Sequence, residues 1–386
     1  MSLTQDPIRI RLTLAPNTRL LAFTIAHLAL QIIRIPMQMT LLQGKISSLC
    51  PYNCGIMTEA QNPKEAVKAA LAPIMQDMIA VDRILREELT TSQSEIIAKV
   101  GNYIVEAGGK RMRPALLMLM ARALGYEGTL HQELGATIEM LHTATLMHDD
   151  VVDEGMMRRG RPTANAQWGN NVAVLVGDFM YTRSFQMMVR IGNLKVMEAL
   201  AGAANTLSEG EVIQMKNAHD PSVDEKRYFE VIERKTSVLF AAAARMAAAI
   251  ANATPEQEQG LVDYALALGN AFQIIDDILD YSANPAESGK NIGADFAEGK
   301  VTLPVIYALE SCSSDDRAFI ETAIREGKGD FEKISEIIKA TGAIEKCKAR
   351  ALAEYERGKN ALSSIPSCIF KNSLLQCFFF VIERKS

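Results

Sequence analysis

Two short acidic clusters have the residue types and spacing that could hold divalent cations. Each has the pattern Asp-Asp-x-x-Asp, and their members are Asp149, Asp150, Asp153, Asp276, Asp277 and Asp280. On a helix, the first and last carboxylates of such a cluster lie one turn apart on the same side. Carboxylate oxygens suit Mg²⁺, which also keeps waters and substrate phosphates among its ligands. The pattern therefore predicts a magnesium site.

A solvated acidic helix surface is the alternative, and for the first cluster alone it explains the residues equally well. The second cluster is different because it is embedded in apolar sequence, which comprises Ala271, Phe272, Ile274, Ile275, Ile278 and Leu279. Buried carboxylates need partners. We therefore expect this cluster to face a cavity or hold metal, with both clusters facing one diphosphate.

Two basic segments accompany the carboxylates. In GGKRMRP (108–114), the glycines allow a tight turn, and Lys110 and Arg113 can converge on an anion beside backbone N–H groups at a helix start. Arg158 and Arg159 follow Asp153 by five and six residues, and arginine suits bidentate contact with a diphosphate. Taken singly, each basic group could be an ordinary surface charge, but their position beside the acidic clusters favours anion binding.

The elements that must position these groups are predicted to be helices. Periodicity and breakers indicate helices at 96–106, 130–153, 172–189, 195–216, 225–251 and 255–281. Thr129 with Gln132, and Thr254 with Gln257, have capping-box spacing, and Pro114 can open a further helix. No convincing alternating strand is found. The region after Met57 therefore reads as one all-α domain.

The composition sets limits on the class of protein. The 386 residues are 48% hydrophobic and carry a net charge of -5, which fits a large core and argues against a nucleic-acid-binding domain. The six cysteines form no CxxC pair, which favours reduced thiols in an intracellular protein. The apolar run 20–33 is shorter than the ~20 residues of a membrane-spanning helix, so we expect a soluble chain with no transmembrane segment.

The composition changes at Met57, which divides the chain into an N-terminal extension (1–56) and a catalytic domain (57–386). Asp6 is the only acidic residue before Met57. Acid-poor starts with Arg, Ser and Thr resemble organelle transit peptides. An upstream extension with Met57 as the working start explains the same composition and is the reading we favour. The first alternative implies a mitochondrial location and the second a cytoplasmic one.

With these motifs in view, the chain resembles the trans-polyprenyl diphosphate synthase family, and most of all bacterial octaprenyl diphosphate synthases. The similar segments run in the family's order through nearly all of the chain after Met57: GGKRMRP (108–114), HTATLMHDDVVDEGMMRRG (142–160), GDFMYTRSFQMM (177–188), EGEVIQM (209–215), FQIIDDILDY (272–281) and GKNIGADFAEGKVTLP (289–304). The resemblance implies an isoprenoid-synthase-type helical bundle around a central active-site cavity.

The resemblance also implies the activity and its partners. The enzyme would condense isopentenyl diphosphate onto an allylic diphosphate such as farnesyl diphosphate, by ionisation, condensation and elimination. Three Mg²⁺ ions would bridge the carboxylates and the diphosphate. The product would be octaprenyl diphosphate for a quinone side chain, made by a homodimer with loose membrane association for product release and no nucleic-acid partner.

Site roles follow from the resemblance residue by residue. The six aspartates and Lys235 would be catalytic, with the aspartates binding metal and, through it, the allylic diphosphate. Arg158 would contact the same diphosphate. Isopentenyl diphosphate would be held by Lys110, Arg113, His142 and Arg159. The site would be closed by Lys235, Thr236, Gln273, Lys290 and Lys300. His142 by itself would more often be an ordinary core histidine.

The length of the product can be related to the helix that carries Asp149. That helix has about 24 residues and is roughly 36 Å long, comparable with an extended chain of eight isoprene units. Thr145 and Ala144 lie one turn before Asp149 and Leu141 a turn further back. In short-chain relatives an aromatic ring stands at the position of Ala144, so a small residue there implies an open path. Packing of a good helix former is the alternative.

Two departures from the family pattern stand out. Ala294 replaces a second acidic residue before Asp295, and residues 365–386 look compressed, with an unusually apolar run at 377–380. Rival readings are a class I terpene cyclase, a non-catalytic partner subunit on the same scaffold, and a synthase of another product length such as solanesyl, heptaprenyl or geranylgeranyl. The intact motifs argue against the first two.

Overall fold

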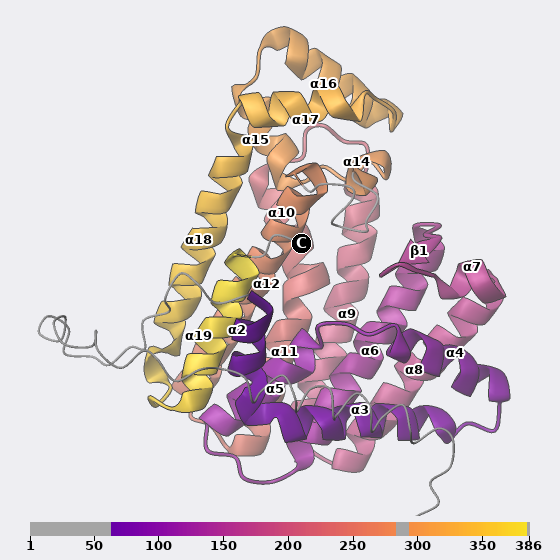
Figure 1. Cartoon of the computed structure of the whole chain (residues 1–386), viewed down its shortest axis with the longest axis vertical. Helices are drawn as coiled ribbons and strands as arrows, with labels where there is room; N and C mark the ends of the chain where they lie inside the picture. The colour runs from indigo at the N-terminus through magenta and orange to yellow at the C-terminus, as the bar shows by residue number, and fades with distance from the viewer. Residues whose placement is uncertain (1–62, 283–292, 384–386) are drawn as a thin grey trace, which may run out of the picture. The chain divides into compact units, whose positions relative to one another are not determined.

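The computed structural model describes residues 63–282 and 293–383 (Figure 1). Several sequence predictions fall outside the described residues. These are the extension 1–56 with its apolar run 20–33, the proposed start at Met57, Cys50, Cys54 and Lys290.

The described part of the chain is almost entirely helical, as predicted. Its first elements are α2 (Pro63–Leu71), η1 (Ala72–Ile74), α3 (Met75–Thr90), α4 (Glu95–Glu106), α5 (Met112–Ala123), α6 (Leu130–Val152), β1 (Met157–Arg158), β2 (Arg161–Pro162), α7 (Ala164–Trp168), α8 (Asn170–Ile191) and α9 (Leu194–Asn217). There follow α10 (Glu225–Ile232), η2 (Glu233–Ser237), α11 (Val238–Ala251), α12 (Pro255–Ser282), α14 (Ala294–Ala297), α15 (Leu303–Ser311), α16 (Ser314–Glu326), α17 (Phe331–Ala340), α18 (Ala343–Ala361), η3 (Leu362–Ser364) and α19 (Ile369–Ile382).

Of the two predicted capping boxes, one is confirmed. The backbone N–H of Thr254 donates to Gln257 Oε1 at 3.0 Å, and the N–H of Gln257 donates to Thr254 Oγ1 at 3.3 Å, at the start of α12. The box at Thr129 is wrong, although α6 does begin there: the Thr129 side chain makes no capping bond. Gln132 instead donates its amide to the buried Asp77 at 2.8 Å, because that carboxylate needs donors more than an exposed helix end does.

The predicted helix 225–251 forms as one continuous helical segment that contains a π turn. Residues Glu233–Ser237 (η2) form i→i+5 geometry between α10 and α11. Single π turns inside helices occur mostly at functional sites, and this one carries two predicted site residues, Lys235 and Thr236.

A two-stranded hairpin corrects the expectation that strands are absent. β1 pairs antiparallel with β2, with Arg158 opposite Arg161. The turn residues Arg159 and Gly160 both have positive φ, 54° and 74°. Two such residues match the twist of a tight hairpin. The hairpin therefore displays Arg158 and Arg159 directly after the first acidic cluster.

Two apolar clusters form the core, and α12 contributes to both. The larger one packs α3, α5, α6, α8, α9, α11 and α19 around the first half of α12. The smaller one packs α10, α15, α16, α17 and α18 around the second half of α12, from Ile274 onward. The second acidic cluster thus lies on the half of α12 that contributes to the smaller core. Figure 1 shows α12 running beside α10 and α18.

The apolar C-terminus forms a packed helix. α19 buries Leu374, Cys377 and Phe378, and the hydroxyl of Tyr264 on α12 donates to the Leu374 carbonyl at 2.6 Å. This packing accounts for Cys377 and Phe378 in the apolar run 377–380, whereas Phe379 is exposed and Phe380 half-buried. The four cysteines within the described ranges are free thiols. No helix among residues 63–282 and 293–383 is long and apolar enough to cross a membrane.

Candidate active site

The first acidic cluster lies at the carboxyl end of α6. Asp150 is buried, and its Oδ1 accepts from Nε and Nη2 of Arg158, both at 2.8 Å. Asn165 on α7 donates to the Asp150 carbonyl at 3.0 Å. Arg158, predicted to contact the diphosphate, is thus fixed beside the cluster by a charge-assisted bond.

Removal from solvent makes this cluster costly to ionise. Burial raises the pKa of Asp149 to about 6, although the nearby charge of Lys235 acts in the opposite direction. Burial also raises the pKa of Asp150, and its bonds with Arg158 oppose that shift. Carboxylates held close together in this way favour a cation that neutralises them.

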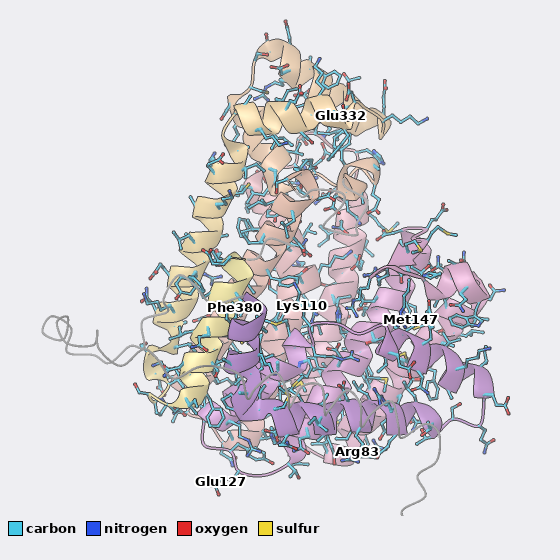
Figure 2. All side chains as sticks on the ribbon, in the orientation of Figure 1. Arg83, Lys110, Glu127, Met147, Glu332 and Phe380 are labelled. Atoms are coloured by element: carbon cyan, nitrogen blue, oxygen red, sulfur yellow. The ribbon has the colours of Figure 1, made fainter. Side chains whose placement is uncertain are left out.

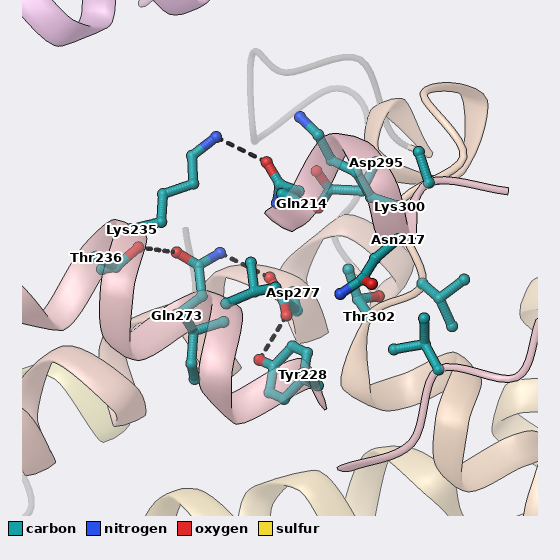
Figure 3. A pocket seen from close by; sticks show the side chains of 15 residues that line it. Gln214, Asn217, Tyr228, Lys235, Thr236, Gln273, Asp277, Asp295, Lys300 and Thr302 are labelled. Carbon is teal, nitrogen blue, oxygen red and sulfur yellow. Dashed lines mark hydrogen bonds between the residues drawn. The ribbon is translucent and has the colours of Figure 1, made fainter. Parts of the chain in front are cut away.

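The second cluster centres on Asp277, which is 1% exposed (Figure 3). Its Oδ2 accepts from the hydroxyl of Tyr228 at 2.7 Å and its Oδ1 from the amide of Gln273 at 2.8 Å. Burial raises its pKa well above the usual range, and the charge of Asp295 adds to the shift. Asp276 and Asp280 lie on the same helix, and Asp280 accepts from the N–H of Gly293 at 3.2 Å.

The π turn supplies two further groups to the site, Lys235 and Thr236. Nζ of Lys235 donates to Glu211 Oε2 at 2.7 Å and to Gln214 Oε1 at 2.8 Å, both on α9. Thr236 donates its hydroxyl to Gln273 Oε1 at 2.9 Å. Glu211 and Gln214 belong to the segment EGEVIQM, for which the sequence predicted no role.

Lys300 reaches the same place from the turn after α14. Its Nζ lies 3.4 Å from Asp153 Oδ2 and also pairs with Glu298. Asp295 lies in the first turn of α14, directly after Ala294. The negative charge of Asp295 helps to raise the pKa of Asp277. Asp295, the one acidic residue kept from the family's pair, is therefore part of the site.

One cavity brings most of these groups together (Figure 3). Its volume is about 130 Å³, and its walls include Gln214, Tyr228, Lys235, Thr236, Gln273, Asp277, Asp295 and Lys300. Typical small-molecule pockets measure roughly 300–1,000 Å³. The cavity is therefore the polar head of a site rather than room for a whole long-chain product.

The donor set fits Mg²⁺ that is completed by substrate. Within residues 63–282 and 293–383, no three His, Cys, Asp or Glu side chains are already grouped as a metal site. Mg²⁺ usually binds through one or two carboxylates plus waters and phosphate oxygens. Carboxylates with raised pKa values at Asp149, Asp150 and Asp277 meet that description without a preformed cage.

A basic cluster lies beside the first acidic one. Removal from solvent lowers the pKa of His142 well below its usual value, and the charges of four arginines lower it further: Arg113, Arg159, Arg158 and Arg111. Burial lowers the pKa of Arg113 to about 10, and its guanidinium lies 4.7 Å from the centre of the Phe240 ring. A neutral imidazole among guanidinium groups is an environment suited to a diphosphate.

Lys110 and Arg113, both predicted to bind isopentenyl diphosphate, differ in burial. Lys110, labelled in Figure 2, is exposed in the turn before α5, whereas Arg113 points into the basic cluster. A Cβ at Gly109 would come within 2.7 Å of Arg159 Nη1, so a larger residue there would have to displace that guanidinium. The first glycine of the motif, Gly108, has a positive φ of 75°, a backbone conformation that favours glycine.

Two of the three residues assigned to product length lie in the core, and the third, Thr145, is half-buried. Ala144 and Leu141 are fully buried, and Thr145 donates its hydroxyl to the His142 carbonyl at 2.8 Å. None of the three lines the 130 Å³ cavity. Their role in product length stays a prediction.

The sequence reasoning missed Tyr228, Arg111 and Glu139. Glu139 is 4% exposed and accepts from Arg111 at 2.8 Å, which anchors one side of the basic cluster. A glutamate in the apolar stretch of α6 was the available signal for this pair. Tyr228 lies 49 positions from its partner Asp277, so no local spacing could reveal it.

Comparison with known proteins identifies the family. A family model described as polyprenyl synthetase matches residues 94–341. The chain is 46% identical over 311 residues to octaprenyl diphosphate synthase of Escherichia coli (strain K12), covering 80% of this chain and 96% of the relative.

Two solved structures have the same fold. A decaprenyl diphosphate synthase from Rhodobacter capsulatus matches with a TM-score of 0.78 at 41% identity, over 84% of this chain and 100% of that one. A polyprenyl synthase from Caulobacter crescentus CB15 was solved in complex with calcium and isoprenyl diphosphate. It matches with a TM-score of 0.80 at 36% identity, over 83% of this chain and 98% of that one. The chain therefore belongs to the polyprenyl synthetase family and is a long-chain trans-prenyl diphosphate synthase, a prenyltransferase of the family that uses isopentenyl and allylic diphosphates.

Proposed function

We propose that this enzyme makes octaprenyl diphosphate from farnesyl diphosphate and isopentenyl diphosphate, and that the product supplies a quinone side chain. The identity of 46% to an octaprenyl diphosphate synthase supports this product. A decaprenyl diphosphate synthase is 41% identical, so a synthase of another length is the alternative that experiment must separate.

The allylic diphosphate binds between the two acidic clusters in this proposal. Mg²⁺ would be held by all six aspartates, Asp149, Asp150, Asp153, Asp276, Asp277 and Asp280, and the family resemblance implies three ions. Bound Mg²⁺ supplies Lewis-acid stabilisation of the departing diphosphate. Family members use this metal. The observation that carries the proposal is that groups from the π turn, α12 and the turn after α14 meet at one polar cavity.

Isopentenyl diphosphate binds at the basic cluster. Lys110, Arg113 and Arg159 donate to its diphosphate, and the neutral His142 adds a donor without adding charge. Support comes from the surroundings of His142, whose pKa is lowered first by burial and then by the charges of several nearby guanidinium groups. An anion there would relieve the repulsion among these arginines.

The residues then act in three steps. Lys235, Lys300 and Arg158 stabilise negative charge as the bond between the allylic carbon and the diphosphate oxygen breaks. The allylic carbon then bonds to the terminal double-bond carbon of isopentenyl diphosphate. This bond leaves a tertiary cation on the methyl-bearing carbon of isopentenyl diphosphate. The next carbon toward the diphosphate then loses a proton to the released diphosphate, and a new double bond forms between these two carbons. Thr236 and Gln273 hold the first diphosphate, and Lys290 completes the closure.

A homodimer is the proposed assembly. Adjacent helices α8 and α9 expose large apolar side chains that the described chain leaves uncovered, namely Leu175, Val189, Leu194, Val212 and Met215. Contiguous apolar patches often mark protein interfaces, and these side chains are the candidates for such a surface. Multi-angle light scattering of the purified chain, with Leu175→Arg as the disrupting variant, tests this assembly.

The product is tested by incubating the purified chain with farnesyl diphosphate and labelled isopentenyl diphosphate. Chromatography of the dephosphorylated products should give a main product of eight units. A different single length selects the alternative synthase, and no product from the chain alone selects the non-catalytic partner subunit.

The metal assignment is tested with Asp149→Ala and Asp276→Ala. Each should reduce turnover by on the order of a thousandfold or more, with an unchanged helical circular dichroism signal. Chelation by EDTA should stop the parent enzyme, and added Mg²⁺ should restore it. Near-normal turnover in both variants would contradict the assignment.

A further inference from the structure

Tyr228 has no part in the site as predicted from sequence, yet it lies in the wall of the cavity (Figure 3). It is on α10, the helix that leads directly into the π turn with Lys235 and Thr236. The side chain is 4% exposed, and its hydroxyl lies 2.7 Å from Asp277 Oδ2. A residue before the π turn thus bonds to the acidic cluster of α12.

The bond belongs to a chain of four side chains. Thr236 donates to Gln273, Gln273 donates to Asp277, and Tyr228 donates to the other oxygen of Asp277, at 2.9, 2.8 and 2.7 Å. Both oxygens of Asp277 therefore have a protein donor. A buried carboxylate with only one of these donors would be poorly satisfied.

Tyr228 and Gln273 hold Asp277 from two directions, because their hydrogen bonds end on different oxygens of the carboxylate. Together the two bonds fix the carboxylate plane of Asp277. The carboxylate plane in turn orients the amide of Gln273. The oxygen of that amide accepts a hydrogen bond from the Thr236 hydroxyl.

We propose that Tyr228 is a positioning residue for prenyl transfer, which acts through Asp277 to hold Gln273 and Thr236 where the allylic diphosphate binds. The proposal rests on the proposed function of this site. It predicts that loss of a single hydroxyl affects turnover and diphosphate binding more than it affects folding.

The test uses Tyr228→Phe with Tyr264→Phe as the matched control. Tyr264 is a fully buried tyrosine whose hydroxyl also donates inside the core, to the Leu374 carbonyl at 2.6 Å, away from the cavity. Both variants should lower Tm by similar amounts. Only Tyr228→Phe should lower kcat, by about tenfold, with KM for isopentenyl diphosphate within about twofold.

A double-mutant cycle asks whether Tyr228 acts through Asp277. Asp277→Ala removes the acceptor of the Tyr228 hydroxyl, so that hydroxyl has no carboxylate left to position. Adding Tyr228→Phe to Asp277→Ala should then change the remaining kcat by less than about threefold. A second full tenfold loss, or equal kcat in Tyr228→Phe and Tyr264→Phe, would overturn the proposal.

Binding is measured without turnover by titrating Mn²⁺ and inorganic diphosphate in a calorimeter. Tyr228→Phe should bind diphosphate about fivefold more weakly than the parent, and Tyr264→Phe should match the parent. Unchanged binding in Tyr228→Phe counts against the proposal. If the parent binds diphosphate but makes no prenyl product, the proposed function fails, and the binding comparison still tests Tyr228.

Discussion

Nζ of Lys300 lies 3.4 Å from Oδ2 of Asp153, although 147 positions separate the two residues. This ion pair joins the end of α6 to the turn after α14, and Lys300 lies in the wall of the cavity that Asp277 also lines. Burial lowers the pKa of Lys300, but its bonds with Glu298 and Asp153 outweigh that effect and raise it. The ammonium therefore stays charged throughout the pH range of ordinary assays.

Lys300→Met should reduce kcat/KM for the allylic diphosphate by about 10- to 100-fold, because a buried charge that stabilises the departing diphosphate is lost. Lys300→Arg should retain more activity than Lys300→Met, since it keeps the charge. Initial rates against allylic diphosphate concentration measure the effect. Lys359→Met, which removes an exposed pair with Glu356, is the control and should match the parent. Equal rates for Lys300→Met and Lys359→Met would exclude this role.

The raised pKa of Asp149 predicts a conflict between stability and activity. Its pKa rises from an ordinary 3.8 to about 6 on folding. The folded protein therefore binds more protons than the unfolded chain between these values, so stability falls as pH rises through this window. Without metal, Asp149→Asn should raise the free energy of unfolding at pH 8 by on the order of 2 kcal/mol.

Thermal unfolding in EDTA at two pH values checks the sign. At pH 8 the Tm of Asp149→Asn should exceed that of the parent, and at pH 4 the difference should shrink, because Asp149 is protonated in the folded parent. The same variant should be nearly inactive. A variant less stable than the parent at pH 8 would show that ionised Asp149 stabilises the empty site.

Much of the fold could be predicted because the long helices carry their own signals. The helix predicted at 130–153 is α6, Leu130–Val152, and the one predicted at 172–189 lies within α8, Asn170–Ile191. Hydrophobic periodicity over such lengths is local information. The π turn at Glu233–Ser237 is not, since its residues have no local preference that separates it from an α-helix.

The acidic and basic motifs of the site could also be predicted, but not how they are held. The positions of Lys235, Gln273 and Lys300 on one cavity depend on contacts between distant segments. The Tyr228–Asp277 bond and the Arg111–Glu139 pair are of the same kind, as is the failed capping box at Thr129. In each of these cases a buried carboxylate is hydrogen-bonded by a donor that is distant in the sequence.

Removal of residues 1–56 should leave the enzyme intact. A chain that begins at Met57 should fold with the same Tm and turn over at the rate of the full chain, because the composition break at Met57 precedes every motif of the site. Side-by-side assays of the two proteins test this. Loss of folding or activity in the shorter chain would mean that residues 1–56 belong to the catalytic domain.

Import and cleavage of the full chain by isolated mitochondria would favour the transit-peptide alternative.

The last prediction concerns product length. Ala144 lies on α6 one turn before the Asp149 carboxylate and is fully buried. If the growing prenyl chain passes along the face of α6 that carries Ala144, Ala144→Tyr should place a ring across its path. The product should then shorten to about three or four isoprene units. The metal ligands are untouched, so the variant should stay active.

Stability separates this path from simple core packing. A tyrosine forced into a filled core costs about 1–3 kcal/mol, whereas a ring that enters a substrate path costs little. Chromatography of the dephosphorylated products and thermal unfolding are measured on the same preparations, with Ala144→Ser as the control that keeps a small side chain and the long product. A shortened product at nearly parental Tm supports the path. A long product from an active Ala144→Tyr enzyme, or a shortened product only from a strongly destabilised one, would mean that the chain grows past another face of α6.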